Sequence, residues 1–268
     1  MTTSGAIAGP IRFINLRNRE TVDGALSYDE PMKITRVSLF RLTQDPHDFD
    51  AVVAIDVLRS FSTAAYAFAA GASKIHTVET AADANYLLKR MPDALTIGAL
   101  PGGRPMPGFD LGNSPSIVQM QSLAGRPVIL STAAGVRALI RFRDAPRLFA
   151  ASLVCAGATL RALQAVEPRR VALITTGEWV DRDGDEDIAC ADYLAAGLLG
   201  HPVDHAVLAK RVRDSDFGRR FVAGTDPALP IADLGLCAAV DRFDFAMPVV
   251  REPDSLVMRP LRIGEGRV

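Results

Sequence analysis

The chain has 268 residues, 49% of them hydrophobic and 23% charged, which is the balance of a globular protein with a sizeable core. Its formal net charge of −1 supplies no overall basic field, which argues against nucleic acid or a membrane surface as a partner. An anionic ligand would have to be held by a local arrangement of groups.

The cysteines and the apolar runs bear on the compartment. Cys155, Cys190 and Cys237 are widely separated and show no CxxC spacing, so neither a disulfide scaffold nor a structural zinc site is expected. No apolar run approaches the length of a bilayer, and the first residues lack the pattern of a secretory signal. We therefore expect a protein of the reducing cytoplasm.

The first 31 residues differ from the rest of the chain. They lack clear periodicity, and we predict that 1–31 form a poorly ordered extension to a domain over 32–268. Met32 precedes the first strand-like pattern, KITRVSLFRL. Apolar runs rich in β-branched residues then predict strands at 51–57, 74–78, 95–97, 127–130, 147–150 and 170–175. Amphipathic stretches predict helices at 60–70, 81–90, 116–121, 134–141, 156–166 and 186–199.

Short strands that alternate with helices predict an α/β fold. Runs such as AVVAID and RVALIT are almost entirely apolar, which indicates strands covered on both faces. We expect a mostly parallel or mixed sheet with helices on both faces, in one domain or in two lobes that divide near 165–205. The remaining elements predicted are helices at 203–212, 215–223 and 231–240 and a late strand at 243–250. These Ala-rich helices are candidates for the interface of a homo-oligomer.

Polar side chains follow the first of the buried strands. Ligands of parallel sheets bind beyond the carboxyl ends of the strands, where this chain places Asp56, Arg59 and Ser60. Asp56 can hold a divalent metal, while Arg59 and the free N–H groups of a helix start suit an anion. Alternatively, Asp56 and Arg59 pair with each other and Ser60 only caps the helix.

A long loop rich in Gly and Pro occupies residues 98–115. Gly102 and Gly103 would allow backbone N–H groups to approach an anion closely, and Asn113 precedes a proline that fits a helix start. Loops of this length are usually functional or disordered, and the many glycines and prolines favour function. We therefore predict that this loop forms part of a binding site.

Two later strand ends repeat the pattern more weakly. Ser131 and Arg137 flank a strand-to-helix junction, and Ser152 follows another strand. These residues are candidates for substrate binding, although helix capping and an ordinary surface arginine explain them equally well.

An acidic segment follows the strand at 170–175. Glu178 comes directly after this strand, so we expect it on the same rim as Asp56, as a metal ligand or a general base. Glu186 and Asp187 open a helix, where the helix dipole alone also favours carboxylates. Trp179 either packs in the core or flanks the pocket.

Together these segments resemble the 2-phosphosulfolactate phosphatase family of coenzyme M biosynthesis. The resemblance covers roughly residues 32–260 in colinear order, and GFDLGNSP is its most specific part. It is carried by IDVLRSFST, GGRPMPGFDLGNSP, STAAGVRAL, GEW…EDIACADYLAAG, RDSDFGRRF and DRFDFAMPVV. It implies a Mg²⁺-dependent α/β hydrolase that converts 2-phosphosulfolactate to sulfolactate and phosphate.

The resemblance and the strand-end positions together define the candidate site. The catalytic candidates are Asp56, Arg59, Asp110 and Glu178. The candidates for substrate binding are Ser60, Gly103, Asn113, Ser131, Arg137 and Ser152. The candidates for metal binding are Asp56, Glu178, Glu186 and Asp187.

The chain is a divergent member by this comparison. Leu100, Ala134 and Cys155 stand where the family pattern has polar residues. Two alternatives therefore stay open: a phosphatase for another phosphorylated hydroxy or sugar acid, and a non-catalytic protein that keeps an anion-binding pocket. In each case the expected partner is a small anionic organic acid.

Overall fold

The structure is a computed structural model that describes residues 32–263, so the extension predicted for 1–31 lies outside the described residues. The strands are β1 (Lys33–Ser38), β2 (Ala51–Ile55), β3 (Lys74–Thr77), β4 (Leu95–Ala99), β5 (Leu111–Gly112), β6 (Pro127–Thr132), β7 (Leu148–Ala151), β8 (Arg170–Thr175), β9 (Met247–Glu252) and β10 (Ser255–Met258). The helices are α1 (Ser60–Ala69), α2 (Ala81–Arg90), α3 (Pro115–Val118), α4 (Gly135–Arg141), α5 (Ala156–Ala165), α6 (Asp185–Leu198), α7 (His205–Asp214), α8 (Asp216–Ala223) and α9 (Ile231–Cys237).

The α/β fold with a mixed sheet is confirmed. Each predicted helix and strand has a counterpart among the observed elements, with small shifts of its ends. The late strand predicted at 243–250 begins only at Met247. Two short strands were not predicted: β5, within the predicted loop at 98–115, and β10, which pairs with β9. Four residues are too few for the alternation of apolar and polar side chains to stand out.

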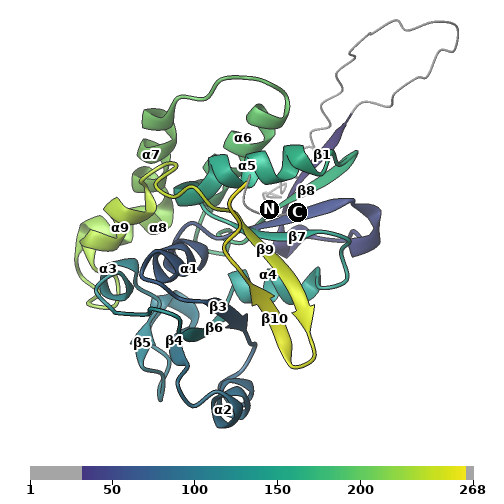
Figure 1. Cartoon of the computed structure of the whole chain (residues 1–268). Coiled ribbons are helices and arrows are strands. Elements are labelled where there is room, and N and C mark those ends of the chain that lie inside the picture. Colours follow the sequence, from purple (N-terminus) through teal and green to yellow (C-terminus); the bar gives the residue numbers. More distant parts are fainter. Residues whose placement is uncertain (1–31, 264–268) are drawn as a thin grey trace, which may run out of the picture.

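All the described strands join one sheet, in the order β1-β8-β2-β7-β9-β10-β3-β6-β4-β5. Two blocks of parallel strands, β1-β8-β2-β7 and β3-β6-β4-β5, are joined by the antiparallel hairpin of β9 and β10. Because three antiparallel pairings lie between β7 and β3, the two blocks run in opposite directions along the sheet. Figure 1 shows this hairpin in yellow, between the two blocks.

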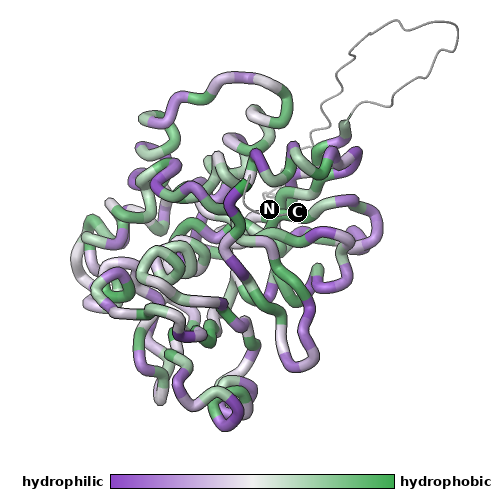
Figure 2. The backbone as a smooth tube through the Cα atoms, in the orientation of Figure 1, coloured by the Kyte–Doolittle hydropathy of each residue, from purple (hydrophilic) through white to green (hydrophobic). Residues whose placement is uncertain are grey.

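The sheet curls around its central helices. Strands of both blocks share one apolar core with α1 and α4, which includes Val52 of β2, Phe61 of α1, Leu130 of β6 and Leu139 of α4. A second core packs α5 to α9 on the outer face of the first block, and a smaller one packs α2 on the second. Figure 2 shows hydrophobic stretches along the strands and inner helices and hydrophilic stretches at many of the connecting turns.

The curl brings together strand ends that a flat sheet would hold apart. The Ser60 hydroxyl at the start of α1 donates to the Thr132 hydroxyl at the end of β6, over 3.0 Å. Thr132 ends a strand of one block and Ser60 follows a strand of the other, so the carboxyl ends of the two blocks meet. No helix within residues 32–263 combines the length and apolar character needed to cross a membrane.

Candidate functional site

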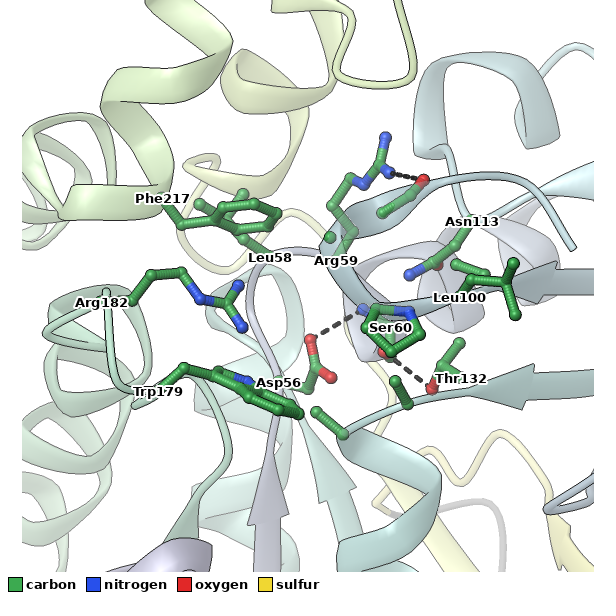
Figure 3. A pocket seen from close by; sticks show the side chains of 16 residues that line it. Asp56, Leu58, Arg59, Ser60, Leu100, Asn113, Thr132, Trp179, Arg182 and Phe217 are labelled. Carbon is green, nitrogen blue, oxygen red and sulfur yellow. Dashed lines mark hydrogen bonds between the residues drawn. The ribbon is translucent and has the colours of Figure 1, made fainter. Parts of the chain in front are cut away.

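A pocket of about 410 Å³ of empty space, open to solvent, lies where the two blocks meet (Figure 3). Its walls come from the ends of β2, β4 and β6, the start of α1, the loop after β8, and α8. The residues that line it are Asp56, Leu58, Arg59, Ser60, Ala99, Leu100, Pro101, Gly102, Gly103, Asn113, Thr132, Ala133, Ala134, Trp179, Arg182 and Phe217.

Asp56 stands at the bottom of this pocket, directly after β2, and its side chain is almost fully buried. One carboxylate oxygen accepts the backbone N–H of Ser60 over 2.9 Å, and the other accepts the N–H of Gly135 over 3.0 Å. The carboxylate therefore joins the starts of α1 and α4, one from each strand block. Each oxygen keeps a further lone pair for a ligand.

The contact between Asp56 and α4 requires a glycine. A Cβ atom added to Gly135 would lie 2.8 Å from the Asp56 carboxylate and 3.0 Å from the Phe61 ring. Real Cβ atoms do not approach other atoms so closely, so the residue at 135 sets where the carboxylate can stand. Gly135 lies in the GVRAL stretch of the sequence, which by itself does not show that Asp56 is the neighbour of this glycine.

Arg59 lines the pocket, but its guanidinium is engaged by the protein. Nη1 donates to the Asp233 carboxylate over 2.7 Å and to the Ala228 carbonyl over 3.0 Å, and Nη2 donates to the Gly103 carbonyl over 3.1 Å. The arginine and Asp233 are both fully buried. Asp56 and Arg59 thus do not pair with each other. Arg59 anchors the glycine loop (residues 98–115), and its charge is paired with Asp233.

The glycine loop lines the pocket through Gly102 and Gly103, both with positive φ. Asp110 fastens the base of this loop, since its carboxylate accepts the backbone N–H of Thr96 over 2.8 Å and the Thr96 hydroxyl over 2.7 Å. Asp110 is absent from the pocket wall. It therefore shapes the pocket from behind.

Asn113 reaches the pocket from the other end of the same loop. Its Oδ1 atom is buried and has no hydrogen-bond partner within the described part of the chain. Buried polar atoms are nearly always hydrogen-bonded, so this amide group is available to a ligand.

Three other predicted residues lie away from the pocket wall. The Ser131 hydroxyl points to the Glu79 carbonyl at 3.5 Å, and the Ser152 hydroxyl lies 2.6 Å from that of Ser62 in the core. Arg137 is exposed on α4. Side chains alternate between the two faces of a strand, so neighbours of a pocket residue can point away from it.

The acidic residues after β8 are dispersed in the same way. Glu178 accepts from Arg41 Nε over 3.0 Å at the surface. Asp187 is fully buried, and its carboxylate accepts the backbone N–H groups of Val57, Thr176 and Gly177 over 2.7–2.8 Å. It ties the ends of β2 and β8 together.

Glu186 is buried beside Asp187, and its Oε2 atom has no hydrogen-bond partner among residues 32–263. Burial raises the pKa of Glu186 to about 7. Burial also raises the pKa of Asp187, and the neighbouring carboxyls of Asp56 and Glu186 raise it further. Asp56 lies on the pocket wall, whereas Glu186 and Asp187 do not.

The donor set bears on the predicted magnesium ion. Within residues 32–263 no three carboxylate, imidazole or thiol groups lie close enough to hold a metal ion together. Asp56, Glu178, Glu186 and Asp187 therefore do not form a metal cage. Mg²⁺, however, is commonly held by one or two carboxylates together with substrate phosphates, and Asp56 on the pocket wall fits that arrangement.

Arg182, Phe217 and Thr132 were not predicted as site residues, and Trp179 was predicted either in the core or beside the pocket. The structure puts all four on the pocket wall. Phe217 lies in RDSDFGRRF and Thr132 in STAAGVRAL, so both segments had been singled out. Other residues of these segments were predicted instead, because charged and hydroxyl groups are the usual markers of such sites.

The segments that line the pocket are shared with known proteins. Residues 39–223 match the family described as 2-phosphosulpholactate phosphatase. Three relatives carry the name "Probable 2-phosphosulfolactate phosphatase". The Synechococcus sp. (strain RCC307) protein is 38% identical over 151 residues, which are 56% of this chain and 61% of that protein. The Bacillus subtilis (strain 168) protein is 30% identical over 76% of this chain and 88% of its own length. The Prochlorococcus marinus (strain MIT 9313) protein is 32% identical over 77% and 91%.

The match to the Synechococcus relative thus spans about three fifths of that protein, whereas the other two are covered almost throughout. The family match includes the ends of β2, β4 and β6, the loop after β8, and α8. Every segment that lines the pocket lies within it. The chain belongs to the 2-phosphosulfolactate phosphatase family.

Proposed function

We propose that this protein is a phosphatase that hydrolyses a phosphate monoester of a small anionic organic acid, with 2-phosphosulfolactate as the first candidate substrate. The observation that carries the proposal is the convergence of the family segments on one pocket, in which Asp56, Ser60, Gly103 and Asn113 meet. Water attacks phosphorus, the ester P–O bond breaks, and the products are sulfolactate and inorganic phosphate.

Asp56 is the carboxylate that can act on the reacting groups. It is the acidic residue on the pocket wall, whereas Asp110 and Glu178, the other candidates for orienting water, are held by Thr96 and Arg41. The two backbone N–H groups fix the orientation of its oxygens, so the carboxylate is preorganised. Asp56 would orient the attacking water and accept its proton.

Magnesium dependence is part of the proposal. Asp56 would supply the protein ligand, and the substrate and water would complete the coordination sphere. When bound, the ion neutralises charge on the phosphoryl oxygens. The requirement is tested by measuring phosphate release from 2-phosphosulfolactate with added Mg²⁺ and with a chelator.

The decisive variant is Asp56→Asn, which keeps the shape of the side chain and removes its charge. We expect kcat to fall by about a hundredfold or more, since a positioned base contributes that much. Asp144→Asn is the matched control, because Asp144 lies at the surface and pairs only with arginines there. Near-normal, magnesium-dependent turnover by Asp56→Asn would contradict the mechanism.

One observation favours a second candidate, a phosphatase for another phosphorylated hydroxy or sugar acid. Leu100, Ala133 and Ala134 give one side of the pocket an apolar lining, so this chain offers fewer polar groups there. Cys155 is buried away from the pocket wall, and burial raises its pKa to about 11, so its thiol is not the nucleophile. A panel of phosphomonoesters with one, two or three further anionic groups would separate the two candidates. If the protein binds these compounds and hydrolyses none of them, it is a non-catalytic binder.

A further inference from the structure

We propose that Arg182 is the residue that binds the phosphoryl group in the pocket. This inference deepens the proposed phosphatase function and rests on it for the identity of the anion. Arg182 was not among the site residues predicted from the sequence.

Positive charge on the pocket wall comes from two arginines, and only one of them is paired with a carboxylate. Arg59 and Arg182 are the two cationic side chains among the residues that line the pocket. The charge of Arg59 is paired with Asp233, and three of its N–H groups donate to Asp233, Ala228 and Gly103. The guanidinium of Arg182, in contrast, has no carboxylate within salt-bridge distance in the part of the chain that the structure describes. It is therefore the cation on the pocket wall whose charge is not already neutralised by a carboxylate.

Two aromatic side chains position the guanidinium of Arg182. Its guanidinium lies 4.5 Å from the centre of the Phe217 ring and 5.4 Å from the Trp179 indole. Figure 3 shows the guanidinium between these two aromatic side chains, directed toward Asp56. Aromatic contacts hold the flat faces of a guanidinium and leave its N–H edge free for two parallel hydrogen bonds to an oxyanion. The arginine is thus oriented without losing its donors.

The segment that carries Arg182 is itself fixed. Trp179 and Arg182 exchange two backbone hydrogen bonds of 3.2 Å, which close a tight turn. Arg220 holds the tip of the turn through Asp181 over 2.7 Å, and Arg41 holds its base through Glu178. A preorganised cation binds an anion with less loss of side-chain entropy.

Two further observations at the same wall point to a ligand. The Trp179 Nε1 atom is buried without a hydrogen-bond partner among the described residues, so the indole N–H is a second free donor. Burial lowers the pKa of Arg182, because desolvation outweighs the distant carboxylates of Glu186 and Asp56. A bound anion would supply the compensating charge.

Binding of inorganic phosphate to the full chain, measured by calorimetry with and without Mg²⁺, tests the proposal without requiring turnover. We expect Arg182→Gln to weaken phosphate binding by about tenfold to a hundredfold, as for the loss of charged hydrogen bonds. Arg182→Lys should give an intermediate loss, because lysine keeps the charge but cannot offer two parallel donors. Arg242→Gln is the matched control: it removes an exposed arginine that lies over another aromatic ring, that of Phe243, away from the pocket wall, and should bind phosphate like the original protein.

Equal phosphate affinity of Arg182→Gln and Arg242→Gln would overturn the proposal, and so would a lack of phosphate binding by the unsubstituted protein. If Arg182→Gln fails to fold, modification of the unsubstituted protein by an arginine reagent carries the test. Phosphate should protect Arg182 and not Arg242, as located by mass spectrometry, and an unprotected Arg182 would overturn the proposal. Phosphate binding through Arg182 without hydrolysis of any ester would refute the phosphatase function alone. Normal hydrolysis and phosphate binding by Arg182→Gln would refute this inference alone.

Discussion

Asp233 is the residue whose replacement should most weaken the fold around the pocket. It lies in the first turn of α9 and is fully buried. One carboxylate oxygen accepts from Arg59 over 2.7 Å, and the other accepts from the Ser114 hydroxyl and the Ser116 backbone N–H, each over 2.9 Å. The side chain therefore connects α9 to the starts of α1 and α3.

The substitution Asp233→Asn removes the charge and places an amide NH₂ against a donor. Either it faces the Arg59 guanidinium or it faces the N–H of Ser116, and the buried guanidinium loses its counter-ion in both cases. Breaking a buried ion pair by changing one partner costs about 3–5 kcal/mol. For a domain of this size each kcal/mol corresponds to about 2–4 °C, so the melting temperature should fall by about 6–20 °C.

Thermal unfolding followed by circular dichroism at neutral pH measures the effect. Asp144→Asn serves again as the control, because the pair of Arg251 and Asp144 is exposed and is worth at most about 1 kcal/mol. The double variant Arg59→Met, Asp233→Leu should recover part of the loss, since it leaves no unpaired charge. A fall of less than about 2 °C for Asp233→Asn, close to the control, would refute the assignment of Asp233 as the counter-ion of Arg59.

Two further expectations concern Gly135 and Glu186. Gly135→Ala should lower turnover by about tenfold or more and destabilise the fold by about 1–3 kcal/mol, because the added Cβ displaces the Asp56 carboxylate. Gly235→Ala is its control, since a Cβ added there meets nothing within 4 Å. Equal turnover of the two variants would contradict the contact between Gly135 and Asp56. Burial raises the pKa of Glu186 from 4.5 to about 7, so the folded state binds more protons than the unfolded state between these pH values. The contribution of protonated Glu186 to stability is therefore fully present below about pH 4.5 and is lost as the pH rises through 7. Glu186→Gln should therefore raise the melting temperature relative to the unsubstituted protein more at pH 8 than at pH 5, and a constant difference across this range would disprove it.

Local chemistry in the sequence determined the elements and part of the site. β2 was predicted because AVVAI is apolar throughout, and each of its side chains is buried. Asp56 was found because an acid that ends a buried strand must stand at the rim of the sheet. Gly103 and Asn113 were found because a long loop with many glycines and a proline at a helix start has few other uses. In each case the signal lies within a few residues of the side chain concerned.

The tertiary structure decided which of these groups face one another. The sequence predicted Arg59 as an anion ligand, yet its carboxylate partner, Asp233, stands 174 residues away in α9. Glu178 was predicted as a metal ligand or general base, yet it pairs with Arg41, 137 residues away. Arg182 escaped notice because its availability depends on Phe217 of a distant helix and on the lack of a nearby carboxylate. The meeting of the two strand blocks likewise depends on the hairpin of β9 and β10, at the far end of the chain. Composition and periodicity describe short-range preferences, whereas the pairing of charges is set by the long-range packing of the sheet.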